Sequence, residues 1–199
     1  MPVTVLNDSK NVQTGKPAVA GSIYRAPLSG SPTIPTDSTT ALAAAFKCLG
    51  YISEDGMKNS WDNDNEEIKA WGGEIVLNVN KSSTDKFKCK LIEALNDDVQ
   101  KAVFGDDNVT ITPATSSAPK TVAVKKNSKE SPYCCWVVEM VLRDGNIKRI
   151  VIPNGKITEV AEISYKDDDA VGYDITISAE KDSDGNTHYE YMTIGTATT

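Results

Sequence analysis

Few residues in this sequence could carry out chemistry, and their spacing does not fit a catalytic arrangement. The single histidine, His188, lies beside a predicted tight turn. A serine or cysteine nucleophile usually needs such a base held next to it. The sequence contains no G-x-S-x-G, P-loop or G-x-G-x-x-G motif, and isolated carboxylate pairs are too common to indicate a glycosidase. We therefore predict that the protein is not an enzyme.

The candidate metal ligands are equally sparse. Asp182-x-Asp184-x-Asn186 resembles the start of an EF-hand loop, but it lacks the glutamate and the flanking helices of that site. No cysteine belongs to a C-x-x-C pair, and adjacent cysteines on a strand point to opposite faces. Buried, reduced thiols are a simpler interpretation than a disulfide or a metal site. We expect no metal and no cofactor. The cysteines are Cys48, Cys89, Cys134 and Cys135.

The charge is distributed unevenly along the 199 residues, whose net charge is −7. Residues 1–150 hold 18 acids and 18 bases, whereas residues 151–199 hold 10 acids and 3 bases. Nucleic-acid binders concentrate positive charge, so this pattern argues against ordinary DNA binding. Solvated acidic turns are the alternative explanation of the acid excess.

No apolar run is long enough to span a bilayer and no targeting segment starts the chain, which predicts a protein made in the cytoplasm.

The first 40 residues are rich in proline, glycine and serine, and they predict an N-terminal arm, 1–40, before a domain covering 41–199. The apolar island Ile23–Pro27 interrupts this arm. We expect it, through Ile23 and Tyr24, to dock on the body or on a neighbouring subunit by pairing a strand edge. Residues 41–47 are alanine-rich and compatible with a helical turn.

Residues 53–70 combine many carboxylates with exposed apolar side chains and predict a long loop. Long loops in compact domains usually have a function, and apolar residues among charges indicate a partner surface. The alternative is that Trp61 folds back onto its own domain. The candidate contact residues are Glu54, Asp55, Met57, Trp61, Glu66 and Glu67.

The remaining pattern is mainly β. Residues 74–79 and 86–92 predict an antiparallel pair joined around 81–85, and Asn96 is placed to cap a short helix over Asp97–Phe104. Five further strands follow from Tyr133, separated by turns such as Asp144-Gly145. We predict a mainly β (α+β) fold, with two packed antiparallel sheets in a sandwich or barrel and one flanking α-helix. The five strands are expected over 133–142, 147–152, 156–165, 171–179 and 188–194.

Several segments resemble the major tail tube protein of bacteriophages with long, non-contractile tails. The resemblance extends from about Gly21 to the C-terminus and departs around residues 61–65 and 114–119. The segments that carry it are FKCLGYISEDG (46–56), EIKAWGG (67–73), LIEALN (91–96), RIVIP (149–153), DDDAVGY (167–173) and DGNTHY (184–189).

This resemblance implies a structural virion protein that self-assembles into stacked hexameric rings. It implies that one sheet of each subunit lines a lumen through which DNA passes, and that the loop at 53–70 and the arm bridge successive rings. The implied partners are other copies of the chain, a tape measure protein, a tail terminator and a distal tail protein. Assembly would occur in the cytoplasm of a bacterial host.

DNA that slides through a tube should be repelled by its wall, because a basic wall would hold the phosphates. The acid-rich last quarter could supply such a wall, and Glu159, Glu162 and Asp174 are the candidates expected on strands. Two alternatives remain open. One is a phage tail terminator or head-tail completion ring, and the other is a monomeric β-sandwich binding module.

Overall fold

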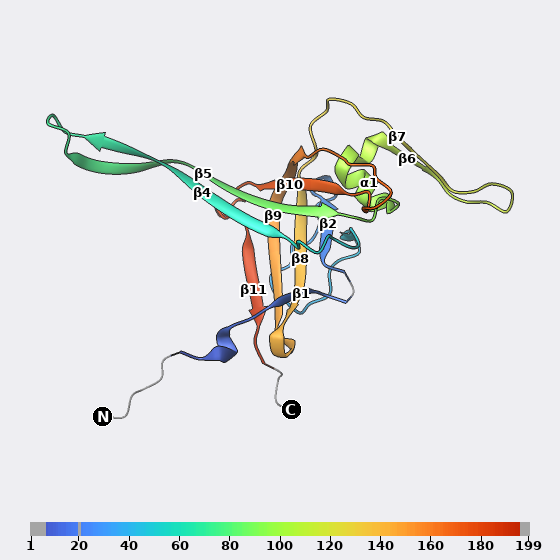
Figure 1. The fold of residues 1–199 in the computed structure, drawn as a ribbon, viewed down its shortest axis with the longest axis horizontal. Coiled ribbons are helices and arrows are strands. Elements are labelled where there is room, and N and C mark those ends of the chain that lie inside the picture. The colour runs from blue at the N-terminus through green and yellow to red at the C-terminus, as the bar shows by residue number, and fades with distance from the viewer. Residues whose placement is uncertain (1–6, 20, 196–199) are drawn as a thin grey trace.

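The computed structural model describes residues 7–19 and 21–195, which form a mainly antiparallel β structure (Figure 1). A nine-stranded sheet has the order β3-β2-β8-β9-β10-β5-β4, with β1 on β8 and β11 on β9. The predicted mainly β fold, with two antiparallel sheets and a helix, is confirmed. The sheet strands are β1 Gly15–Pro17, β2 Ile23–Pro27, β3 Lys47–Cys48, β4 Lys58–Lys69, β5 Ile75–Leu91, β8 Cys134–Leu142, β9 Ile147–Val160, β10 Tyr173–Ala179 and β11 Tyr189–Thr193. The second sheet pairs β6 Val109–Thr112 with β7 Thr121–Val124.

The long strand β9 joins two layers of the nine-stranded sheet. Its first half pairs with β8 and β11, and its last half pairs with β10. Figure 1 shows β8, β9 and β11 crossing the direction of β10, β5 and β4, an arrangement in which a strand that changes layer forms the corner. The packed layers are thus halves of one continuous sheet. The two strands expected over 147–152 and 156–165 are one strand in the structure, because residues 153–155 continue it and it ends at Val160.

Gly155 is required at this corner for close packing. A Cβ atom there would lie 2.9 Å from the Trp136 ring and 3.1 Å from Ile177. The buried Trp136 indole Nε1–H donates to the Gly155 carbonyl oxygen at 3.1 Å. The corner therefore satisfies the polar atom of the largest core side chain.

Strand β8 is buried on both faces. Cys134 and Trp136 face the main core between the layers, whereas Cys135 and Val137 face a second, smaller core. The predicted opposite orientation of Cys134 and Cys135 is confirmed, and all four cysteines are free thiols. Burial raises the pKa of Cys89 and of Cys135 to about 12.

Residues 37–46 cover the second core without forming the helical turn predicted for 41–47. Phe46 is 7% exposed there, and Leu42 packs beside it. The Asp37 carboxylate accepts hydrogen bonds from the amides of Thr39 and Thr40 at 2.7 and 2.6 Å. Side-chain hydrogen bonding with Thr40, followed by these two amide bonds, holds the pKa of Asp37 well below its usual range. Packing of Leu42 and Phe46 against the sheet overrides the helix propensity of the alanines.

Helix α1, Asp97–Phe104, forms as predicted and flanks the sheet. The Asn96 side chain caps it by accepting from the Asp98 amide at 3.0 Å, and Asp97 and Asp98 lie at its positive end. Val99 and Val103 bury its apolar side in the main core. Besides this helix, the structure contains 3₁₀ turns at η1 Ser9–Asn11, η2 Leu28–Gly30, η3 Asp106–Asn108 and η4 Arg143–Gly145.

The apolar island of the N-terminal segment docks as a strand on the body of its own chain. β2 lies between β3 and β8, and Tyr24 is directly opposite Val137. Ile23 is fully buried in the main core, and Tyr24 packs partly against the second core. In the structure Ile23 and Tyr24 therefore lie in a strand paired with β8 and β3, and β2 belongs to the sheet of the body.

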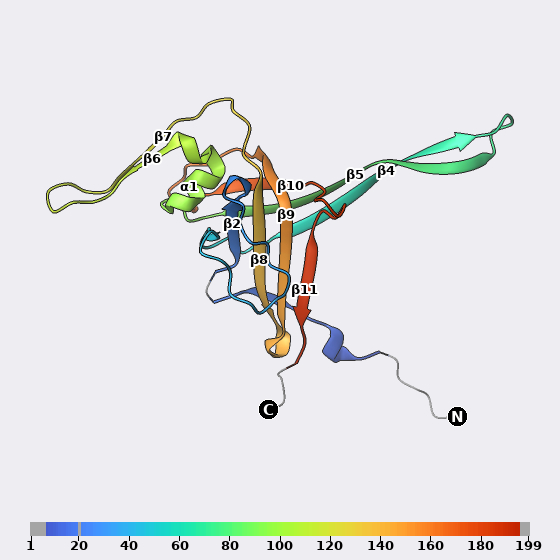
Figure 2. The same ribbon diagram turned by 180° about the vertical axis from the view of Figure 1, so that it is seen from behind.

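The predicted loop at 53–70 is wrong, because residues 58–69 form strand β4. β4 pairs with β5 over its whole length, and β5 is one continuous strand rather than two strands joined at 81–85. Residues 61–69 of β4 and 75–84 of β5, which lie between Asp85 and the tip of the hairpin, are exposed on both faces. The sequence therefore carries no apolar–polar alternation there. Figures 1 and 2 show the resulting hairpin projecting from the body.

Candidate assembly surfaces

The outer part of the β4–β5 hairpin, which we call the distal hairpin (residues 62–80), has no core of its own. Five carboxylates and one lysine belong to it. Ile68 and Leu77 are directly opposite each other, as are Glu66 and Val79, so these side chains share one face. The exposed apolar residues are Ile68, Trp71, Ile75, Val76, Leu77 and Val79. A concentration of exposed apolar residues on a protrusion is typical of a contact surface.

Trp61 lies on β4 where the hairpin leaves the core. It is directly opposite the buried Asp85, on the face that carries Phe87 further along β5. The Trp61 side chain nevertheless remains 69% exposed, so it does not fold back onto its own domain. This indole is available to another chain.

The other predicted contact residues have different environments. Met57 packs against the main core, so the expectation of an exposed apolar anchor is wrong. It directly precedes β4, at the end of the hairpin that joins the body. Glu54 and Asp55 are exposed in the turn before β4. Glu66 and Glu67 are on β4, where they form exposed ion pairs with Lys81 at 2.8 Å and Lys69 at 3.5 Å.

A buried carboxylate fixes the base of the hairpin. Asp85, 4% exposed, accepts hydrogen bonds from Asn59 Nδ2 at 2.7 Å and Thr187 Oγ1 at 2.7 Å, and lies 2.6 Å from His188 Nδ1. The His188 ring packs edge-on against Phe87. Asp85 was not predicted as a functional residue, and its one signal in the sequence is an acid beside the lysines of an otherwise basic strand. The histidine therefore has a structural role, joining the segment before β11 to the hairpin.

The EF-hand-like segment is a turn. One oxygen of the Asp182 carboxylate accepts from the amides of Asp184 and Asn186 at 2.9 and 3.0 Å, and the other accepts from the Tyr189 hydroxyl at 2.7 Å. These hydrogen bonds, that from Tyr189 first, lower the pKa of Asp182. Across the described ranges, no group of three or more His, Cys, Asp or Glu could hold a metal ion.

The outer face of the layer formed by β9, β10, β5 and β4 carries both signs of charge. Register pairs place Asp174 beside Lys90 and Thr176 beside Glu159, and residues directly opposite each other share a face. The charged residues on this face are Lys58, Asp62, Asp64, Lys86, Lys88, Lys90, Lys156, Glu159 and Asp174. Two of the predicted lumen acids are thus brought together, but lysines outnumber acids around them.

The third predicted lumen acid, Glu162, is not on a strand. β9 ends at Val160, and the Ala161 amide makes the last hydrogen bond, to the Asp174 carbonyl, at 2.9 Å. The chain then leaves the sheet, so Glu162 lies in an exposed connection. The expectation of a strand position there is wrong, because β9 ends at Val160 and Ile163 then packs against the main core instead of continuing the sheet.

A β-rich body with a long protruding hairpin and an uncovered sheet face defines a protein that acts through contacts with other chains. A family model described as a phage tail tube protein matches residues 6–197. The chain therefore belongs to a family of phage tail tube proteins, a structural class found in virion tails. No curated protein matches the chain. In the described part of the chain, no helix is long and apolar enough to cross a membrane.

Proposed function

We propose that copies of this chain assemble into hexameric rings that stack into the tube of a phage tail, the conduit for genome delivery into the host. The observation that carries the proposal is a pair of open strand edges. β4 pairs with β5 alone, and residues 156–160 of β9 pair with β10 alone, among the described strands. These edges bound the same four-stranded layer.

Open strand edges are templates for pairing with another chain, and closure into a ring removes them. Because the two edges differ and lie on opposite borders of the layer, they would pair head-to-tail. Head-to-tail interfaces produce rings when the rotation closes. The distal hairpin, with its Glu66, Glu67 and apolar residues, would then reach a neighbouring ring.

The stacked tube is favoured over the two alternatives by the hairpin. A tail terminator or head-tail completion ring would close without stacking, and a monomeric binding module would need neither open edge. The 17-residue strand β5 has ten consecutive exposed residues from 75 to 84, a length that a single ring does not require. The other tail partners would be a tape measure inside the tube, a terminator and a distal tail protein.

The four-stranded layer would line the lumen, since its outer face is uncovered. Glu159 and Asp174 would then repel the passing DNA and offset part of the positive charge of the lysines, which outnumber the acids on this face. Replacing Glu159 and Asp174 with lysine should preserve tubes but slow genome delivery, most at low salt where screening is weakest. Delivery at the normal rate would show that these two positions do not govern passage.

The assembly itself is tested by sedimentation and negative-stain microscopy of the purified protein at rising concentration. We expect rings and tubes with a central channel. A protein that remains monomeric at high concentration, even when tail tips or an initiator are supplied, would contradict the proposal. Rings that never stack would support the terminator alternative instead.

A further inference from the structure

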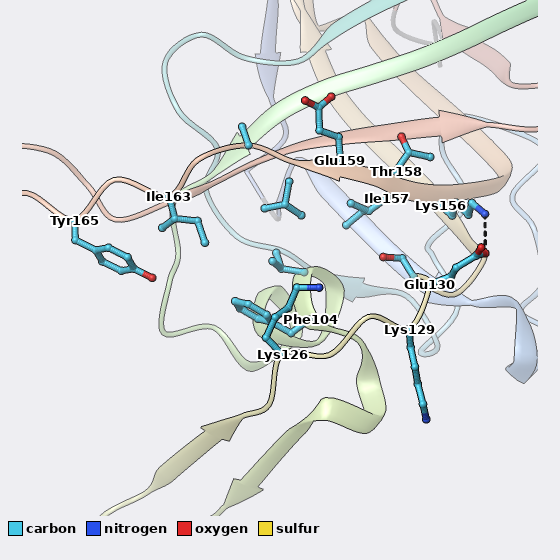
Figure 3. Close-up of a pocket in the computed structure, with 14 residues that line it drawn as sticks. Phe104, Lys126, Lys129, Glu130, Lys156, Ile157, Thr158, Glu159, Ile163 and Tyr165 are labelled. Atoms are coloured by element: carbon cyan, nitrogen blue, oxygen red, sulfur yellow. Dashed lines mark hydrogen bonds and ion pairs between the residues drawn. The ribbon is translucent and has the colours of Figure 1, made fainter.

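A groove of about 650 Å³ lies along the open edge of β9, between that edge, α1 and residues 126–131. Figure 3 shows its lining, with Tyr165 at one end and the ion pair between Lys156 and Glu130 at the other. Phe104, Ile157 and Ile163 supply apolar surface. The Tyr165 side chain is 74% exposed. None of the residues that the structure describes fills this groove.

From this geometry, and resting on the proposed function, we infer that the groove receives strand β4 of a second copy, with Trp61 as its anchor. The first reason is the face on which Trp61 lies. Trp61 is on the core-side face of β4, and Ile157 of β9 points into the core. If β4 of a neighbour extends the sheet beyond β9, its Trp61 lies on the same side as Ile157, over the groove.

The second reason is charge. Residues 120–130 hold four lysines and one glutamate, and Lys126 and Lys129 line the groove. The incoming strand carries Asp62, Asp64, Glu66 and Glu67. Asp62 and Asp64 lie on the face of β4 opposite to Trp61, so the attraction acts between the two charged segments as a whole and not inside the groove. Opposite charges on the two surfaces favour this pairing and disfavour pairing of β4 with another β4.

The third reason is placement. In Figures 1 and 2 the β4–β5 hairpin extends from one side of the body, while α1, which lines the groove, lies on the other side together with the β6–β7 hairpin. A protrusion and its receptor on opposite sides cannot meet within one molecule. They can meet between successive copies in a ring.

The direct test places a photo-crosslinking amino acid at Tyr165, on the groove, in the full-length chain. After irradiation of assembled rings, we expect a crosslinked dimer whose partner peptide contains residues 58–64. The matched control is the same amino acid at Tyr51, an equally exposed aromatic position, 75%, away from the groove. No crosslink from Tyr51 to residues 58–64 is expected.

The anchor is tested by substitution. Trp61→Ala should raise the protein concentration needed for ring formation at least about tenfold, because buried aromatic residues dominate interface energies. Trp61→Phe should raise it much less. Because the Trp61 side chain is 69% exposed, both variants should remain folded, and circular dichroism checks this.

The outcomes separate the two proposals. Rings that form without a crosslink from position 165 to 58–64, or that tolerate Trp61→Ala, would overturn the groove assignment and leave the tube proposal standing. Failure of the unmodified chain to form rings would instead overturn the tube proposal.

Discussion

The two halves of the β4–β5 hairpin share their strands but differ in what stabilises them. In the inner half, Phe87, Cys89 and Leu91 of β5 are buried, and Asp85 is fixed by three partners. In the distal hairpin every β5 residue is exposed. An isolated two-stranded ribbon is marginally stable in water. The comparison indicates that the inner half serves folding, whereas the distal half is available for assembly.

Removing the distal hairpin should break this comparison most completely. Asp64 and Ser82 are directly opposite each other, so residues 65–81 can be replaced by Asn-Gly, a favoured two-residue turn. We expect a folded subunit whose free energy of unfolding changes by less than about 1 kcal/mol, together with complete loss of tubes. Urea denaturation and micrographs check the two parts. Tubes of normal length would show that the distal hairpin is dispensable.

Phe87→Ala should affect the inner half strongly. The ring is fully buried in the main core, and truncation of such a residue costs about 3–5 kcal/mol. Urea denaturation of the free subunit measures the loss. A cost below about 1 kcal/mol would contradict the placement of the folding core in this half.

Asp85→Ala tests the polar part of the inner half. The substitution leaves the Asn59, Thr187 and His188 side chains without their shared acceptor, which should cost about 1–3 kcal/mol. His188→Ala is the comparison variant and should cost less, because Asp85 keeps two donors. Equal losses would show that the histidine dominates the network.

The smallest effect on stability is expected from Ile68→Ser combined with Leu77→Ser. These facing residues are 45% and 54% exposed, and surface substitutions usually change the free energy of unfolding by no more than about 0.5 kcal/mol. Tube formation should nonetheless weaken, because the shared apolar face is lost. Unchanged assembly in a sedimentation series would remove this face from the interface.

The sequence predicted the elements that bury one face and failed where burial is absent. The alternation of Phe87, Cys89 and Leu91 with lysines correctly marked a half-buried strand, and Asn96 correctly marked the start of α1. Strand β4 carries polar residues on both faces. Its composition is typical of a loop, and a loop was therefore predicted there. The open edges and the Asp85 network arise from pairing between distant segments, which no local pattern records.

Hydrogen exchange, measured by mass spectrometry on free subunits and on assembled tubes, tests the division of the hairpin most directly. We predict that amides of residues 85–91 are protected in both forms, because that half is buried in the subunit itself. Amides of residues 62–80 should exchange rapidly in free subunits and become protected in tubes. Equal protection of residues 62–80 in both forms would contradict the claim that other copies of the chain stabilise the distal hairpin.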